Sequence, residues 1–521
     1  MEKTLVRKQN DNIKLTKEKI LDVEVNSVDT EDPPPLKKSQ LAIILVGIFF
    51  GVFVSGVDDT ILATAEEAIV KEFKAPNYVT WIATSYLMSM VVFTPLYGKF
   101  CDIFGRKLIM LFSLFTFSLG SLGCGLSQNI IMLIIFRSVA GIGGGGIVST
   151  SYVIISDLVK LEDRGTYLGL ISISFAISNM LGPILGGIIV EHASWRVVFY
   201  INLPVAGILA GIVIFVMPLP WVEGTILSKL KRVDYLGVFT LSLSIILFVL
   251  STTWAGGDYS WSSYQVLLPF CLSFAFLAIF FFVESKIARE PVLPPQMFNL
   301  NVVICSLINT ILGISDFTII YYLPIYFQIL KGESASQSGY ELAPFLVVSA
   351  LVAMASGLLA TKLKSFRYFI WFGCILMTIG SGLLCLISPN LPSWAVILFS
   401  CILSFGMGCS IQITAIGAQA SSKPEHIAIV ASFFNFTMNF GGTIGLAIDG
   451  SIINGFFANI KDLIDSGTDG HGPIPQIEID TYYLAIRAIF YFLLATSILG
   501  LLSSIFLKHK SLKGVKMTAS H

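Results

Sequence analysis

Several ionisable residues of this sequence stand inside long apolar stretches, where a charge is costly, and five of them are candidates for chemistry. They are Asp58, Asp59, Arg137, Asp316 and Asp449. In a membrane segment such residues persist where they are paired, hydrated or protonated, and they mark paths for protons, ions or substrates. A carboxylate there can take up a proton or pair with a cation, and an arginine favours the charged carboxylate. We therefore predict that these five residues bind protons or substrate.

Asp58 and Arg137 form the most informative pair. Asp58 lies roughly 25 Å along the first apolar stretch, and Arg137 enters its own stretch from the opposite side by roughly 10 Å. In an apolar layer about 30 Å thick these depths are compatible, so we expect the two side chains to approach each other. A change in their distance would switch how strongly Asp58 holds a proton; the alternative is a purely structural ion pair. Asp59 points to another face of the same helix.

Two further acids, Asp316 and Asp449, lie in the second half of the chain. Asp316 is in the middle of its apolar stretch, where it suits a cationic substrate. Asp449 lies near the outer end of its stretch, where a place at the membrane interface is the alternative. We therefore expect Asp316 to be the better candidate for a substrate contact.

Other kinds of chemistry lack their residues. None of the five histidines is near the middle of an apolar stretch, which argues against a membrane enzyme that uses histidine as a base or ligand. No GxxxxGK[ST] sequence is present, and the eight cysteines show no metal-ligand spacing. Without a basic domain, nucleic-acid binding is not expected. We expect no enzyme activity, no metal, no cofactor and no ATP-driven step.

The elements that position these residues are membrane helices. Of the 521 residues, 55% are hydrophobic and only 13% are charged. Fourteen apolar stretches are long enough to cross a bilayer. When both ends of the chain are placed in the cytosol, 26 of the 33 Lys and Arg residues fall on the cytosolic side and 5 on the other. This asymmetry supports an even number of helices and cytosolic termini.

A short loop is expected between the second and third helices. It reads Gly98-Lys-Phe-Cys-Asp102-Ile-Phe-Gly105-Arg106-Lys107. Its glycines allow a tight turn, and Asp102 stands where the beginning of another helix could attract it. The segment resembles the G-x-x-x-D-x-x-G-R-K signature of the major facilitator superfamily at every fixed position. By that resemblance, Asp102 would cap the start of the thirteenth helix, near His426, and hold the cytosolic gate shut.

Other segments resemble the drug:proton antiporters of that superfamily with fourteen helices. Arg137 is followed by Gly141 and Gly143, like the R-x-x-x-G-x-G element, and Gly182-Pro183-Ile-Leu-Gly186-Gly187 is like the antiporter element G-P-x-x-G-G. Clustered glycines let helices pack closely, and Pro183 gives a bend point. Asp58 stands at the acidic position of the D-x-T-I-V-x-x-A-L-P element. Glu66-Glu67 replaces its Leu-Pro, which departs from the pattern.

The resemblance implies an all-α polytopic membrane protein with two six-helix bundles and two inserted helices. The expected divisions follow in chain order: a disordered cytosolic tail 1–40, a first bundle 41–220, a linker with the inserted pair 221–298, a second bundle 299–508 and a cytosolic tail 509–521. Alternating access would come from rocking of the two halves, driven by a proton gradient. The partners are then protons, the lipid bilayer and a small cationic or amphipathic substrate, and the chain is expected to be monomeric.

The substrate class is expected from the acids. Because extra carboxylates accompany Asp58, we favour proton-coupled antiport of basic amino acids across a vacuolar membrane, as in similar fungal transporters. The alternatives are a multidrug exporter at the plasma membrane and a siderophore carrier. A nutrient receptor that does not transport is less favoured, because a receptor needs no proton site.

Overall fold

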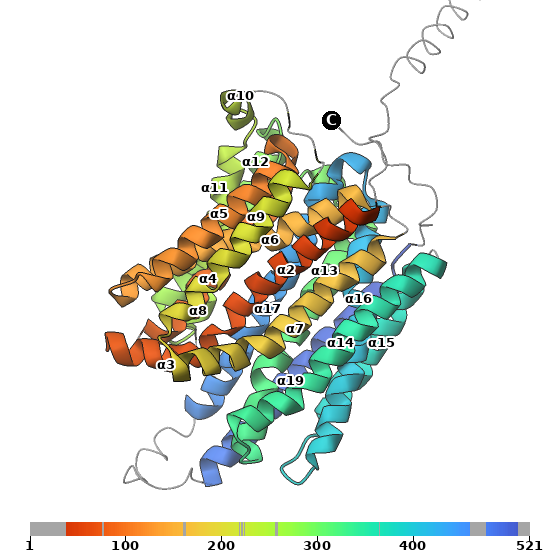
Figure 1. The fold of residues 1–521 in the computed structure, drawn as a ribbon. Coiled ribbons are helices and arrows are strands. Elements are labelled where there is room, and N and C mark those ends of the chain that lie inside the picture. Colours follow the sequence, from red (N-terminus) through yellow and green to blue (C-terminus); the bar gives the residue numbers. More distant parts are fainter. Residues whose placement is uncertain are drawn as a thin grey trace, which may run out of the picture. The chain divides into compact units, whose positions relative to one another are not determined.

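The computed structural model describes residues 38–508, except 75–77, 160–162, 218, 220, 221, 223, 224, 256–258, 364 and 459–475. Almost all of the tail 1–40 and the whole of the tail 509–521 lie outside the described residues. The described chain is helical apart from short connections (Figure 1).

The longer helices and two short ones that matter here have the following bounds: α2 Lys38–Thr60, α3 Leu62–Phe73, α4 Val79–Phe104, α5 Arg106–Gly125, α6 Ile130–Leu158, α7 Arg164–His192, α8 Arg196–Tyr200, α9 Asn202–Phe215, α10 Ile226–Leu230, α11 Tyr235–Trp254, α12 Tyr264–Lys286, α13 Leu300–Ile325, α14 Ala335–Leu363, α15 Arg367–Leu384, α16 Ser393–Ser421, α17 Ile427–Ala458 and α19 Gln476–Ser504. Among the described residues, 14 stretches are long and apolar enough to cross a membrane. The predicted number of membrane helices is confirmed.

Glycines allow the helices of the first bundle to lie in backbone contact. In α6, a Cβ on Gly141 would stand 2.2 Å from the carbonyl oxygen of Tyr86 in α4, and one on Gly143 would stand 2.2 Å from the backbone nitrogen of Phe117 in α5. No side chain fits in either gap, so α6 is held directly against both neighbours. This close approach fixes the place of Arg137, which lies one turn before Gly141 on α6.

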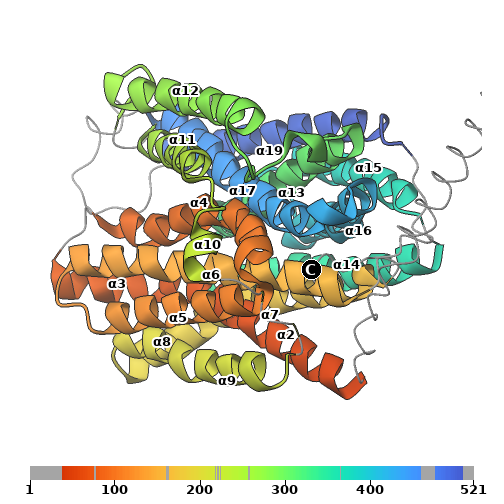
Figure 2. The same ribbon diagram turned by 90° about the horizontal axis from the view of Figure 1, so that it is seen from above.

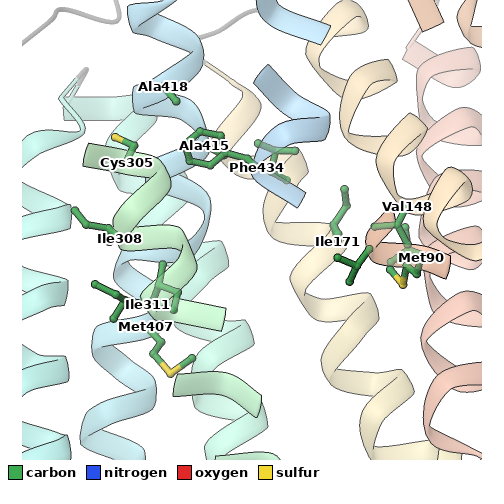
Figure 3. Packing of buried hydrophobic residues seen from close by; sticks show 14 of the residues in the cluster. Met90, Val148, Ile171, Cys305, Ile308, Ile311, Met407, Ala415, Ala418 and Phe434 are labelled. Carbon is green, nitrogen blue, oxygen red and sulfur yellow. The ribbon is translucent and has the colours of Figure 1, made fainter. Parts of the chain in front are cut away.

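The second bundle is built in the same way around α13, α16 and α17. A Cβ on Gly313 of α13 would stand 2.0 Å from the carbonyl oxygen of Met438 in α17. Buried apolar side chains fill the space between helices, and Figure 3 shows Ile308 and Ile311 of the second bundle and Val148 and Ile171 of the first. All four belong to one cluster of buried apolar side chains, which extends through both bundles.

The inserted pair, α11 and α12, pack against each other and lie beside both bundles. Figure 2 shows α11 next to α4 of the first bundle and α17 of the second, and the three are in contact. The rings of Phe248 in α11 and Phe440 in α17 have centroids 5.3 Å apart. The pair thus covers the line along which α4 and α17 meet.

The two bundles contact each other at the end that carries the turn between α4 and α5, which we call the basic end. There α4 meets α17 and α7 meets α14. Gly165 of α7 lies so close to Gly357 of α14 that a Cβ on Gly357 would stand 2.2 Å from the carbonyl oxygen of Gly165. Gln412 of α16 donates a hydrogen bond to Ser172 of α7 at 2.6 Å. The conformation is therefore closed at the basic end.

Candidate functional site

The carboxylate of Asp58 sits at the end of α2 and is completely buried. Nη1 of Arg137, from α6, donates to one carboxylate oxygen at 2.6 Å, and Nδ2 of Asn202, the first residue of α9, donates to the other at 2.6 Å. The same Asn202 amide group contacts Oγ of Ser121 in α5 at 3.2 Å. As their depths indicated, Asp58 and Arg137 are in contact, and four helices of the first bundle converge on this pair.

Aromatic rings enclose the guanidinium of Arg137. Its central carbon lies 4.3 Å from the ring centre of Tyr86 and 5.9 Å from that of Phe199. Nε of Arg137 donates to the carbonyl oxygen of Ile82 at 3.3 Å, while Nη2 is buried and has no hydrogen-bond partner in the described part of the chain. A buried charge pair without water depends on its geometry, because removing one partner leaves the other charge uncompensated. The pair is thus sensitive to any movement of α2 against α6.

Sequence reasoning missed Asn202 and Tyr86 as members of this site. Asn202 lies in the segment Trp195-Arg196-Val-Val-Phe-Tyr-Ile-Asn202, which follows the antiporter-like element and was not predicted to take part in the site. An asparagine at the first residue of an apolar helix is the signal that could have found it, since buried amides need partners.

Asp59 and Asp316 are placed differently from Asp58. Both are partly exposed, and within the described residues neither makes a hydrogen bond or an ion pair. On α13, Asp316 lies half a turn of rotation, about 180°, from Leu307, which is 37% exposed on the outer face of the helix. Asp316 therefore faces the interior of the protein and not the lipid.

Asp449 is completely buried on α17, so protein atoms, and not water or lipid, surround its side chain. Oγ1 of Thr318 in α13 donates to one of its carboxylate oxygens at 2.6 Å. The structure thus places one buried acid in each bundle, Asp58 with a cationic partner and Asp449 with a hydroxyl partner.

The motif at the basic end is not a loop. Helix α4 continues to Phe104, and Gly105 alone, with φ of 94°, separates it from α5. This φ is in the region that glycine adopts readily, so Gly105 makes the turn. Cys101, which we expected in a cytosolic loop, is instead in the last turn of α4 and completely buried. The expectation of a loop from Gly98 to Lys107 was wrong because the apolar faces of this segment pack as helix.

Asp102, in the last turn of α4, pairs with Arg106, the first residue of α5. Its carboxylate lies 3.1 Å from Arg106, and Arg106 also pairs with Asp157 of α6 at 2.6 Å. The contact with the beginning of α17 is made by Gly98, whose N–H donates to Oγ of Ser432 at 3.1 Å. The described contacts therefore assign the joint between α4 and α17 to Gly98, where a side chain would meet the α17 backbone at 2.8 Å.

The basic residues of the motif bind other elements. Nζ of Lys107 donates to the carbonyl oxygen of Ile214 at the end of α9, at 2.9 Å, where a helix end attracts a cation. Lys99 pairs with Glu290, in the connection from α12 to α13, at 3.1 Å, and Arg232 pairs with the same carboxylate at 2.8 Å. The guanidinium of Arg232 and then the ammonium of Lys99 lower the pKa of Glu290 below its ordinary value. The inserted pair is thus tied to α4 by charge.

The glycines of the antiporter-like element lie on α7, and they differ in how closely other helices approach them. A Cβ on Gly182 would stand 2.0 Å from Oγ1 of Thr60 in α2, whereas a Cβ on Gly187 would meet nothing within 4 Å. Gly186 and Pro183 lie within the same helix. Only Gly182 is therefore shown to need its small size for packing against α2. Across the described ranges, no three His, Cys, Asp or Glu side chains gather as ligands of a metal ion would.

Comparison with known proteins gives consistent matches. The family model described as Major Facilitator Superfamily matches residues 48–446. Citrate exporter 1 of Yarrowia lipolytica is 31% identical over 429 residues, covering 82% of this chain but only 64% of that protein, so the match spans less than two thirds of the exporter. The MFS-type efflux pump LUC4 of Fusarium sp is 31% identical over 454 residues, which cover 87% of this chain and 80% of that protein. Multidrug resistance protein 3 of Bacillus subtilis is 31% identical over 440 residues, with 84% and 85% covered.

Solved structures show a similar fold. The human organic anion transporter MFSD10 (TETRAN) has a TM-score of 0.60 at 14% identity, covering 91% of this chain and 100% of that one. The proton:xylose symporter XylE, bound to 6-bromo-6-deoxy-D-glucose, has a TM-score of 0.61 at 13% identity, with 92% and 99% covered. At these identities the likeness concerns the arrangement of helices alone.

Proposed function

From the premise that the chain belongs to the major facilitator superfamily, whose members are secondary transporters and not enzymes, we propose that it is a proton-coupled antiporter that exports small organic molecules. The observation that carries this proposal is the buried pair of Asp58 and Arg137 held by Asn202. A carboxylate that is paired in one conformation and separated from its cation in another changes its proton affinity. That change is what couples a proton to a rocking transporter.

Export is supported by the similar proteins. Their names describe efflux pumps, multidrug transporters and a citrate exporter, and none of those compared here is named as an amino acid transporter. The alternative of multidrug export, stated from the sequence, is therefore better supported than our first preference for basic amino acids. We propose the plasma membrane as the site of export, with the basic end in the cytosol, because Lys and Arg gather on that side.

A second candidate function rests on Asp316. Its carboxylate is partly exposed toward the protein interior without a cationic partner among the described residues, which suits recognition of a cation. Proton antiport of basic amino acids into a vacuole uses the same coupling site and differs only in substrate and membrane. Both candidate functions therefore predict proton coupling through Asp58, and they predict different substrates.

The test uses the full chain reconstituted into vesicles whose interior is acidic. Ethidium, citrate, lysine and arginine are offered outside, and internal pH and substrate are followed. We expect ethidium to accumulate while protons leave, and a protonophore to abolish both. Uptake of lysine and arginine instead would favour the vacuolar candidate, and uptake that is independent of the pH gradient for every probe would reject proton coupling.

A further inference from the structure

Asp449 is a buried acid that has no role in the coupling site of Asp58 and Arg137. It lies on α17, in the second bundle, and its side chain is completely buried. Oγ1 of Thr318 donates to one carboxylate oxygen, Oδ2, at 2.6 Å. The other oxygen, Oδ1, is buried and has no hydrogen-bond partner among the residues that the structure describes. A buried polar atom without a partner is rare enough to need an explanation.

The contrast with Asp58 is direct. Both oxygens of Asp58 accept a hydrogen bond, one of them from the cation Arg137, so its charge is compensated. Among the described residues no basic side chain forms an ion pair with Asp449. An ionised carboxylate buried without a cation is strongly disfavoured, and the neutral acid is the form that such a site accepts.

The elements around Asp449 leave little room for a compensating charge. On the α13 side the helices are in backbone contact, since a Cβ on Gly445 would stand 3.1 Å from Cα of Ile314. Within the described ranges, the titratable group that interacts electrostatically with the Asp449 carboxylate is the phenol of Tyr322, also on α13, which is itself buried. A phenol supplies a hydroxyl and no positive charge at neutral pH.

We propose that Asp449 is a second proton-binding site, in the second bundle, which carries a proton in this conformation while Asp58 carries none. The inference rests on the proposed proton coupling and extends it. A proton from water joins the Asp449 carboxylate and gives a neutral acid held by Thr318. It returns to water on the other side of the membrane when rocking of the two bundles opens the second bundle to water there and hydrates the site. The transporter then exchanges at least two protons for each substrate molecule.

The number of protons sets how far a substrate can be concentrated. At zero membrane potential, one proton per substrate supports a gradient of about tenfold for each pH unit, and two support about a hundredfold, because each tenfold step equals one pH unit of driving force. Asp449→Asn mimics the neutral acid in shape and keeps an acceptor for Thr318. We therefore expect this variant to transport with the smaller ratio.

Protonation itself is tested without substrate, by infrared spectroscopy of the full chain at neutral pH. The C=O band of a protonated carboxylic acid should be present in the wild type, lost in part in Asp449→Asn, shifted in Thr318→Val and unchanged in Asp58→Asn. Asp316→Asn is the matched control for loss of a membrane acid, and its spectrum should keep the band that Thr318→Val shifts. A spectrum of Asp449→Asn identical to that of the wild type would overturn the proposal.

The stoichiometry is tested in vesicles clamped at zero potential with potassium and valinomycin, using whichever of ethidium, citrate, lysine or arginine the wild type couples to protons. The limiting concentration ratio should fall from about a hundredfold per pH unit to about tenfold in Asp449→Asn. An unchanged ratio would show that Asp449 neither takes up nor releases a proton during the transport cycle. This result would refute the inference and leave the proposed proton coupling through Asp58 intact. A wild type that couples none of the four probes would reject the proposed function, and with it the second proton.

Discussion

Replacing Gly165 by alanine should open the basic end of the protein. Gly165 of α7 and Gly357 of α14 hold the two bundles in backbone contact there. A Cβ on Gly165 would stand 2.7 Å from the carbonyl oxygen of Gly357 and 2.8 Å from its Cα. Ordinary contact for a Cβ begins near 3.4 Å, so the bundles must separate by several tenths of an ångström or more.

The magnitude follows from the cost of overpacking, which is typically about 1–3 kcal/mol. In this case the cost falls only on the conformation closed at the basic end, because the two glycines separate when that end opens. Alanine also favours helix over glycine, but this gain is the same in both conformations and cancels. A bias of 1–3 kcal/mol changes the ratio of open to closed protein by about 5- to 150-fold.

A Ser432→Cys substitution provides a reporter of this equilibrium. Ser432 of α17 is completely buried and accepts a hydrogen bond from the N–H of Gly98 in α4, so a thiol reagent should reach a cysteine there only after α4 and α17 separate. We expect its labelling rate, measured by mass spectrometry of the peptide, to rise by about 5- to 150-fold in Gly165→Ala. Gly187→Ala is the matched control on the same helix, because its Cβ would meet nothing within 4 Å. Equal labelling rates in the two variants would refute the reasoning.

Three further predictions concern the coupling site and the opposite end. Asp58→Asn should abolish accumulation of substrate driven by a pH gradient and keep exchange at equal concentrations, and accumulation against a gradient in this variant would place the proton site elsewhere. Asn202→Ala removes a hydrogen bond to the charged carboxylate of Asp58, worth about 1.5–3 kcal/mol, so accumulation driven by a pH gradient should fall, and unchanged accumulation would show that coupling does not need this hydrogen bond. On α3, outside the candidate spans, the hydrogen bond from Arg196 lowers the pKa of Glu72 below its ordinary value of 4.5. This contact therefore stabilises the protein fully above that value, and the stabilisation is lost as the pH falls through the lowered pKa. Thermal unfolding measured from pH 7 to about pH 2 should show a smaller loss of stability in Glu72→Gln than in the wild type.

The number of membrane helices could be predicted because it depends on the local length of apolar runs. The contact of Asp58 with Arg137 could be predicted because depth along a helix is a simple product of residue count and rise. Asn202 could not be found in this way, since its role depends on how α9 is rotated against α2. The rotation of a helix about its axis is set by packing over the whole bundle, so it cannot be predicted from the sequence of one segment.

The motif at the basic end shows the same limit. Its residues indicated the family, yet their partners were predicted only in part. Asp102 was expected to reach α17, and instead the described contacts pair it with Arg106, while the glycine four residues earlier touches α17. Glu290, which ties the inserted pair to Lys99, gave no signal because it is one charge among several in a connecting segment. Partners that are distant in sequence become visible only in three dimensions. The boundaries 41–220, 221–298 and 299–508 stay predictions.

The position of α11 gives the two faces of the protein different relations to the surrounding lipid. Two lines of contact separate the bundles, α4 against α17 and α7 against α14, and α11 lies over the first of them. Acyl chains that approach this line first meet α11, whose Phe248 ring lies tilted by 45° against the ring of Phe440 in α17. Along the second line the glycine backbones of α7 and α14 face each other directly. A hydrophobic molecule dissolved in the bilayer therefore meets α11 on one side of the protein and the α7–α14 contact itself on the other. Entry from the membrane should then differ between these two sides of the transporter.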